Sequence, residues 1–178
     1  YYTHLFRNSE KVELNGRYTH HAIFDETIEF IKANKDRPFF CYCPWTPPHA
    51  AYQIPEDEPA WALYKDKPWP KDARVVAAMD SMMDRQVGKI LTLLKELGID
   101  ENTIVFFTSD NGGYLHYAGR HRGDISSNGP LRGQKGEVYE GGHRVPAIAW
   151  WPGHVQAGTV TDAAALTMDL FPTLLELA

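Results

Sequence analysis

An aspartate and an asparagine stand side by side where an apolar stretch of the chain ends. Asp110 and Asn111 follow the β-branched and aromatic run 104–107 and precede two glycines. Such a run is typical of a buried strand that stops at a turn. Ligands bind at the carboxyl ends of strands in open α/β sheets, and carboxylate and amide oxygens suit Ca²⁺ or Mg²⁺. The alternative is a turn whose side chains bond only local backbone.

A second segment, 129–146, is dense in glycine and charge and leads into another apolar run, 147–151. Lys135 stands there in the sequence Gly-Gln-Lys-Gly. A lone lysine would be interpreted as a solvated loop charge, but flanking glycines let the backbone approach a ligand closely. The whole Gly-rich stretch 112–142 is long for a loop inside a compact domain, which is typical of a functional loop.

The ordered set of motifs in this chain resembles the C-terminal half of the catalytic domain of a type I (formylglycine-dependent) sulfatase, in the alkaline phosphatase superfamily. The motifs are TSDNGG at 108–113, PLRGQKGEVYEGGHRVP at 130–146 and WWPG at 150–153. Further matches are PFF at 38–40 with TPPH at 46–49, MDRQVG at 83–88 and DLFPT at 169–173. The resemblance covers roughly residues 19–178.

The resemblance implies a role for particular side chains. Asp110 and Asn111 match a metal-ligand pair, usually for Ca²⁺, with Mg²⁺ as the alternative. Lys135 matches the lysine that contacts the sulfate and the bridging oxygen. His49 matches the histidine that touches the substrate and protonates the leaving group, for which an imidazole is well suited near neutral pH. His121 lies in the Gly-rich loop, where many sulfatases place substrate-recognition groups.

Other readings of the histidines and charged residues stay open. His49 could instead pack against Trp45 and Tyr52. His116 shares the Gly-rich loop with His121 and has the same two readings, a substrate contact or a solvent-exposed side chain. For Glu140 and Arg144, within the second segment, we expect a buried ion pair or loop clamp.

The family's nucleophile, formylglycine, is made from the cysteine of a Cys-x-Pro/Ala-Ser-Arg motif, which this sequence does not contain. We therefore expect the nucleophile in an N-terminal part that precedes these residues, and about half of an active site here. Cys41 and Cys43 would point to the same face of a strand. That is a poor arrangement for bridging to each other, and we interpret them as two small buried hydrophobes.

Three functions compete on these grounds. The first is a sulfatase acting on sulfate esters of carbohydrate or aryl alcohols, with a sulfated small molecule or glycan as substrate. The second is a phosphate or phosphonate ester hydrolase of the same superfamily. The third is an inactive fragment or pseudoenzyme that only binds an anion or a partner chain. Family members are commonly periplasmic, extracellular or lysosomal, although nothing in the sequence shows where this protein resides.

Composition narrows the class of protein. The chain has 178 residues, 43% hydrophobic and 23% charged, and a formal net charge of −5, which argues against nucleic acid as a partner. No apolar run approaches the ~20 residues that a membrane span needs. The chain begins Tyr-Tyr-Thr without Met, so we expect a processed or partial product.

Hydrophobic periodicity predicts alternating helices and strands. Helices are expected from 19 to about 36, from 72 to 97 with one apolar stripe from Val75 to Leu97, and from 169 onward. Strands are expected at 38–44, 103–109 and 147–151, with a short one at 163–166. The alternation favours an α/β sandwich with a largely parallel sheet, which the resemblance makes alkaline-phosphatase-like. So few strands suggest a partial domain, and we expect the isolated fragment to expose a sheet edge and self-associate.

Overall fold

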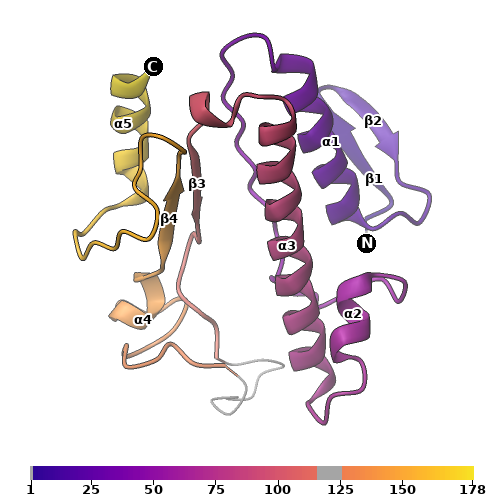
Figure 1. The fold of residues 1–178 in the computed structure, drawn as a ribbon. Helices are drawn as coiled ribbons and strands as arrows, with labels where there is room; N and C mark the ends of the chain where they lie inside the picture. Colours follow the sequence, from indigo (N-terminus) through magenta and orange to yellow (C-terminus); the bar gives the residue numbers. More distant parts are fainter. Residues whose placement is uncertain (1, 116–125) are drawn as a thin grey trace. The chain divides into compact units, whose positions relative to one another are not determined.

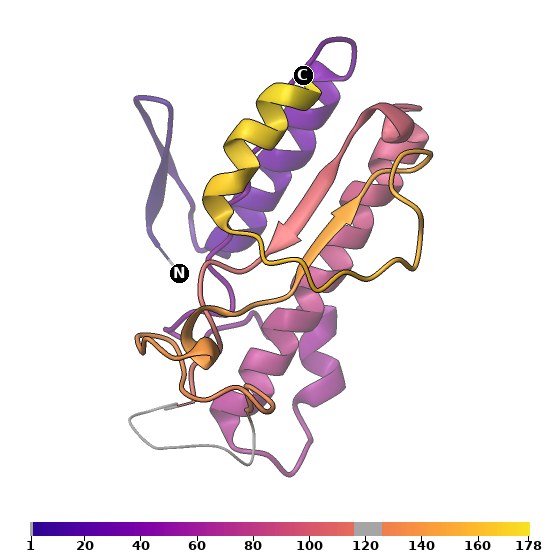
Figure 2. The ribbon, with the colours of Figure 1, turned by 90° about the vertical axis from the view of Figure 1, so that its left-hand side faces the viewer.

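The computed structural model describes residues 2–115 and 126–178. The chain divides into two compact units, Tyr1–Asp100 and Glu101–Ala178, and each is described by its own residues within those ranges. Figure 1 shows the elements of each unit in sequence colours, and Figure 2 shows them from the side. In the part of the chain that is described, no helix has the length and apolar character to cross a membrane.

The first unit begins with a β-hairpin followed by a helix. Strands β1 (His4–Arg7) and β2 (Glu10–Glu13) pair antiparallel, and Asn8 between them adopts a left-handed φ of 55°. Helix α1 then runs over Thr19–Asn34, which confirms the predicted helix. It ends shortly before Pro38, because the residue that precedes a proline is disfavoured in helical geometry.

Helices α2 (Pro59–Tyr64) and α3 (Lys71–Glu96) pack against each other (Figure 1). Helix α3 confirms the predicted long helix, and Gly98 follows it with a φ of +69°, the left-handed conformation that commonly ends helices. Val75, Met79 and Leu94 of the predicted apolar stripe are buried. Ala78 and Met82 lie on the same side of the helix, three and seven positions after Val75, and cluster with Tyr18 and Ala60.

The strand expected at 38–44 is wrong for this structure, since residues 38–46 have no regular secondary structure. A strand is defined by a hydrogen-bonded neighbour. Within the described part of this unit, the extended strands are β1 and β2, which pair with each other.

The second unit is built on the pair β3 (Val105–Thr108) and β4 (Ala147–Trp150), which confirms the strands expected there. Their pairing is antiparallel, with Val105 opposite Trp150 and Thr108 opposite Ala147, so the expected parallel arrangement is wrong for this pair. Parallel neighbours need a crossover, usually a long helix. Among the described residues between these strands, the only helix is the single-turn α4 (Glu140–His143). Strand β4 therefore begins at Ala147, opposite Thr108, the residue at which β3 ends.

The chain closes with the 3₁₀ turn η3 (Thr167–Asp169) and helix α5 (Leu170–Leu177), as predicted from Asp169 onward. The short strand expected at 163–166 is wrong. The backbone N–H of Leu166 donates to Asp169 Oδ2 at 2.7 Å, and that of Ala163 donates to Thr161 Oγ1 at 3.2 Å. These donors therefore cap a turn and are not available to a strand ladder.

Candidate active site

Asp110 and Asn111 lie in the bend just past the end of β3, as predicted. The Asn111 side-chain amide donates to Asp110 Oδ1 at 2.5 Å, so the two side chains meet. Ser109 Oγ donates to the Asn111 carbonyl at 2.9 Å and tightens the bend. Asp110 is exposed and Asn111 half-buried, which leaves the carboxylate open to a ligand.

The turn that carries this pair is hydrogen-bonded to the loop that carries Lys135. Gly112 N donates to the Gly142 carbonyl at 2.9 Å, and Lys135 N donates to the Gly113 carbonyl at 3.0 Å. The structure therefore brings Asp110, Asn111 and Lys135, which are 24 to 25 positions apart in sequence, onto one backbone scaffold.

Glycine is required where these segments touch. A Cβ atom on Gly112 would lie 2.0 Å from the Gly141 carbonyl oxygen, and one on Gly141 would lie 2.1 Å from the Gly133 carbonyl oxygen. Gly133 and Gly136, on either side of Lys135, have φ values of +84° and +88°. The glycine density of the sequence is thus explained by backbone-to-backbone packing and by left-handed turns.

Two residues of this scaffold were missed by the sequence analysis. The Asn128 side-chain amide donates to the Gly113 carbonyl at 3.1 Å and to the Gly133 carbonyl at 2.9 Å. The buried Gln134 accepts from Leu115 N at 2.7 Å through its Oε1. An Asn-Gly pair inside a Gly-rich segment was the available signal for Asn128, since asparagine side chains commonly bond turn backbone. Nothing comparable marked Gln134.

Glu140 and Arg144 form the expected ion pair, but it is not buried. Arg144 Nη1 lies 3.1 Å from Glu140 Oε2, and the two side chains are 62% and 60% exposed. They sit four positions apart along α4 and its C-cap, a spacing that brings side chains together on the outside of a helical turn.

His49 belongs to the other unit and is exposed. Its Nδ1 lies 2.9 Å from the Ala50 carbonyl oxygen, and its backbone N–H donates to the Thr46 carbonyl at 2.9 Å. Because a carbonyl only accepts, Nδ1 carries the hydrogen, and Nε2 is the ring atom that remains for proton exchange. His49 lies in the first unit and Lys135 in the second. His116 and His121 lie outside the described residues.

The donor chemistry of the Asp110–Asn111 pair fits a hard cation in part. Ca²⁺ takes six to eight oxygen ligands, and the amide oxygen and nitrogen of Asn111 exchange places by a simple flip. Over residues 2–115 and 126–178 no three His, Cys, Asp or Glu side chains gather as a metal cluster. The pair can therefore supply a portion of a coordination shell.

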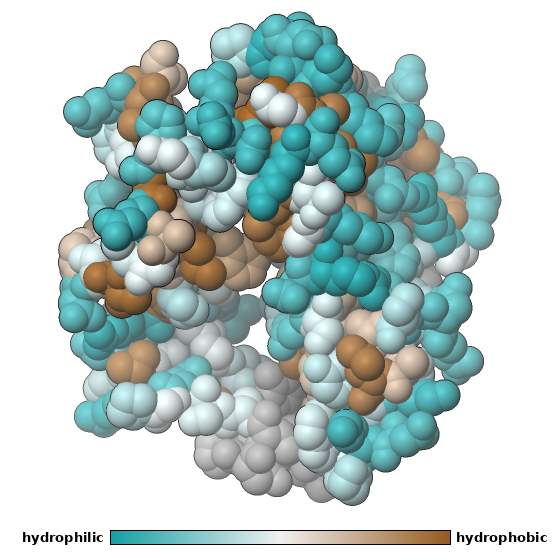
Figure 3. All heavy atoms as spheres, viewed as in Figure 1, coloured by the Kyte–Doolittle hydropathy of each residue, from teal (hydrophilic) through white to brown (hydrophobic). Residues whose placement is uncertain are grey.

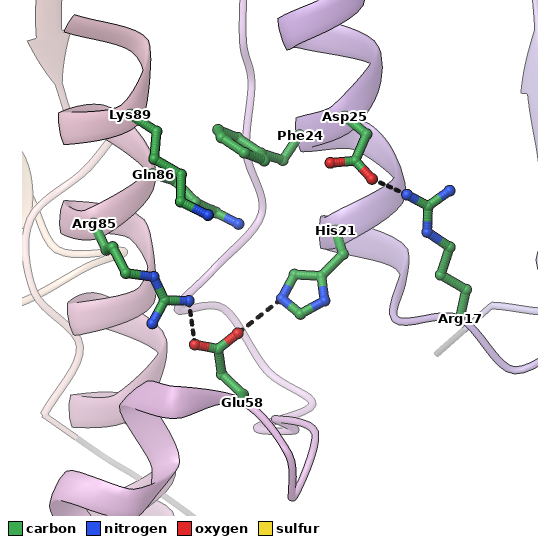
Figure 4. A pocket seen from close by; sticks show the side chains of 8 residues that line it. All are labelled: Arg17, His21, Phe24, Asp25, Glu58, Arg85, Gln86 and Lys89. Atoms are coloured by element: carbon green, nitrogen blue, oxygen red, sulfur yellow. Dashed lines mark hydrogen bonds and ion pairs between the residues drawn. The ribbon is translucent and has the colours of Figure 1, made fainter. Parts of the chain in front are cut away.

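A separate polar pocket of about 290 Å³ lies within the first unit (Figure 4). At its centre Glu58, whose side chain is only 3% exposed, accepts from Arg85 Nη2, from His21 Nε2 at 3.0 Å and from Ala60 N at 3.2 Å. Burial would raise the pKa of Glu58, but the Arg85 hydrogen bond and the Ala60 N–H outweigh it, so the pKa lies below its ordinary value. The lining residues are Arg17, His21, Phe24, Asp25, Glu58, Arg85, Gln86 and Lys89.

This cluster joins three helices, because His21 lies on α1, Glu58 caps α2 and Arg85 lies on α3. Its charges are largely internally paired, and Asp25 also binds Arg17. We interpret it as a clamp that holds the helices together.

Comparison with known proteins places this geometry in a family. The model of the Sulfatase family matches residues 1–178. The N-acetylgalactosamine-6-sulfatase of Canis lupus familiaris is 42% identical over 157 residues, covering 86% of this chain and 27% of that protein. The uncharacterized sulfatase YdeN of Escherichia coli (strain K12) is 34% identical over 178 residues, covering 98% and 30%. The chain thus spans less than a third of these relatives.

Solved structures agree with the sequence comparison. Ps i-CgsB in complex with k-i-k-neocarrahexaose superposes with a TM-score of 0.81 at 33% identity, covering 94% of this chain and 36% of that one. The PsFucS1 sulfatase from Pseudoalteromonas sp. has a TM-score of 0.71 at 33% identity, covering 89% and 29%. These likenesses confirm the alkaline-phosphatase-like α/β class, present here as a partial domain.

Proposed function

Since the chain belongs to the Sulfatase family, we propose that the protein of which it forms part hydrolyses sulfate esters. The observation that carries the proposal is the hydrogen-bonded scaffold that holds a carboxylate–amide pair and a lysine together. Hydrolysis of a sulfate monoester needs positive charge for the sulfuryl oxygens, an in-line nucleophile and an acid for the departing oxygen.

Each residue receives a role in this proposal. Asp110 and Asn111 hold a Ca²⁺ ion, with Mg²⁺ as the alternative, and other parts of the protein complete its shell. When bound, the cation supplies positive charge that polarises the sulfuryl group. Lys135 offers an ammonium group to the sulfate and to the bridging oxygen. His49, with Nδ1–H held by Ala50, delivers a proton from Nε2 when the ring is protonated.

The nucleophile is assigned to formylglycine in a part of the protein that precedes these residues, so the 178-residue chain alone is proposed to be inactive. We place the chain in the C-terminal half of the catalytic domain. His121 is kept as a proposed substrate contact in the loop between the two motifs.

The proposed substrate is a sulfated glycan. One relative is named for N-acetylgalactosamine 6-sulfate chemistry, and one similar structure holds a neocarrahexaose. The alternative substrate is a small molecule, a sterol or aryl sulfate. It is suggested by the steryl-sulfatase of Mus musculus, which is 35% identical to this chain over 158 residues.

The test uses the full-length protein, with a 6-sulfated amino sugar, an aryl sulfate and the matching phosphate esters as substrates. We expect sulfate release, its loss in Lys135→Ala and Asp110→Ala, and formylglycine in a Cys-x-Pro/Ala-Ser-Arg peptide by mass spectrometry. Phosphate release without sulfate release would assign the protein to the phosphate or phosphonate hydrolases instead. If a correctly modified protein released neither sulfate nor phosphate, that result would support the pseudoenzyme.

A further inference from the structure

Cys41 and Cys43 are the two cysteines of the chain, and the structure brings their sulfur atoms together. The Sγ atoms lie 3.6 Å apart, and both residues are free thiols. Both are half-buried, so the expectation of two buried hydrophobes is wrong in this structure. Cys43 Sγ also lies 3.7 Å from Thr27 Oγ1 of α1, which orients the pair toward that helix.

The two sulfurs are chemically unequal. The hydrogen bond from Cys41 lowers the pKa of Cys43 to about 6, against the effect of burial and with help from the Thr27 hydroxyl. The same hydrogen bond, together with burial, raises the pKa of Cys41 above its ordinary value. Near neutral pH the arrangement is therefore a Cys43 thiolate that accepts from a Cys41 thiol. A thiolate beside a second thiol is the arrangement that thiol–disulfide exchange requires.

We propose that Cys41 and Cys43 form a reactive dithiol site that closes to an intramolecular disulfide by exchange with small disulfides. The Cys43 thiolate attacks one sulfur of the reagent RSSR, forms a mixed disulfide and releases RS⁻. Cys41 then loses its proton, attacks Cys43 Sγ and releases the second RS⁻. The two protein thiols are oxidised, the reagent disulfide is reduced, and the two thiol protons end on two molecules of RSH.

The local backbone permits this closure. The sulfurs must move from 3.6 Å to a bond of about 2.05 Å. Two cysteines at alternate positions of an extended segment form a disulfide poorly when the hydrogen bonds of a sheet hold the backbone. Here residues 38–46 have no regular secondary structure, so side-chain rotation and a small backbone adjustment can supply the movement.

The test treats the reduced full-length protein with oxidised glutathione at pH 7 and digests it with trypsin. Because the Arg37–Pro38 bond resists trypsin, the peptide 36–65 carries both cysteines and no other. We expect this peptide to lose the mass of two hydrogen atoms and to regain it with dithiothreitol. Persistence of a glutathione adduct on the unmutated protein, or a bond from either cysteine to a different cysteine, would overturn the proposal.

Two single variants assign the roles. In Cys41→Ser the hydroxyl still donates to Cys43, but no second thiol resolves the adduct, so a stable glutathione adduct is expected on Cys43. In Cys43→Ser the serine hydroxyl can donate to Cys41 in the same way, but the Thr27 hydroxyl that helps to lower the pKa of Cys43 lies against position 43. We therefore expect the thiol of Cys43→Ser to react more slowly at pH 7 than the thiol of Cys41→Ser. Circular dichroism verifies that each variant is folded. Equal reaction rates in the two variants would refute the assignment of Cys43 as the attacking thiol.

Discussion

Asp110 and Asn111 are adjacent side chains that together form the part of the candidate metal-binding site found in the described part of this chain. Their contact at 2.5 Å shows that both point to one place at the end of β3. A binding site that exists only in the folded state stabilises that state in proportion to ligand occupancy. This makes the candidate testable without an activity assay.

Calcium should raise the thermal stability of the full-length protein, by about 2.7 kcal/mol at a free concentration 100 times the Kd. In Asp110→Ala the added calcium should have little effect, because the charged ligand of the pair is gone. Thermal unfolding with and without CaCl₂, after chelator treatment, measures this. Asp84→Ala is the matched control, since Asp84 is exposed on α3. The same calcium response in Asp110→Ala and the parent would contradict the assignment, and MgCl₂ titrations separate the two cations.

The exposed imidazole of His49 makes a different prediction. If Nε2 protonates the departing oxygen, His49→Ala should lower kcat by roughly 10²–10⁴-fold on an alkyl sulfate. The loss should be much smaller on an aryl sulfate whose leaving group needs no proton. Steady-state kinetics on both substrates gives the comparison, with the exposed His154→Ala as control. Unchanged turnover of the alkyl sulfate would remove His49 from this role.

At the scale of elements, the turn after β3 and the loop that carries Lys135 are joined by backbone contacts, which we call the interlock. These contacts depend on glycines, because a side chain would not fit between the two segments. Gly112→Ala would place a Cβ 2.0 Å from the Gly141 carbonyl oxygen. Since backbone must move to admit it, we expect a loss of about 1–3 kcal/mol in the free energy of unfolding and weaker calcium binding.

Gly88→Ala is the matched control for that substitution. Gly88 lies inside α3, and a Cβ there meets no atom within 4 Å. Replacing a helical glycine with alanine should raise the free energy of unfolding by about 0.5–1 kcal/mol. Urea denaturation compares the two variants, and a Gly112→Ala protein as stable as its parent would argue against the interlock.

The Glu58 clamp makes stability depend on pH. The pKa of Glu58 is depressed in the folded state, so its contribution is complete above the ordinary glutamate pKa and is lost as the pH falls through the folded value. Glu58→Gln should cost about 1–3 kcal/mol near pH 7, because Arg85, whose side chain is 35% exposed, loses its charged partner. It should also flatten the fall in stability below about pH 4.5.

Urea denaturation across pH 3–7 measures this effect. The control is Glu56→Gln, an exposed neighbour of Glu58 in sequence. A Glu58→Gln variant whose stability falls with acid as steeply as that of the parent would show that the clamp does not carry this pH dependence.

Features set by local sequence were the ones that could be predicted. The period of α3, the helix after Asp169 and the turn after β3 follow from residue type and spacing. The strand at 38–44 and the parallel pairing failed because a strand is specified by its neighbours, and these are not encoded in its own residues. Glu58 was missed because its partners His21 and Arg85 lie 37 and 27 positions away, on separate helices.

For the molecule as a whole, the distribution of apolar surface in the second unit is informative. Figure 3 shows brown apolar side chains at the surface where α5 and β4 lie. Phe107 and Ile148 are cross-strand partners, 44% and 59% exposed, and Phe106 on the opposite face is 36% exposed. A pair of strands apolar on both faces is typical of a sheet interior covered on both sides. Together with the partial span of its relatives, this leads us to expect that these strands are covered in the full-length protein.

The isolated 178-residue chain should therefore self-associate. Its strands β3 and β4 pair with each other and present apolar faces, a combination that promotes edge-to-edge and face-to-face contact. Light scattering over increasing protein concentration should show a rising mass for the fragment. Ile148→Lys should reduce it, because the charge opposes burial of the face shared with Phe107, whereas the exposed Glu56→Gln should not. A constant monomer mass at high concentration would contradict this prediction, because it would show that the exposed strands are tolerated in the isolated chain.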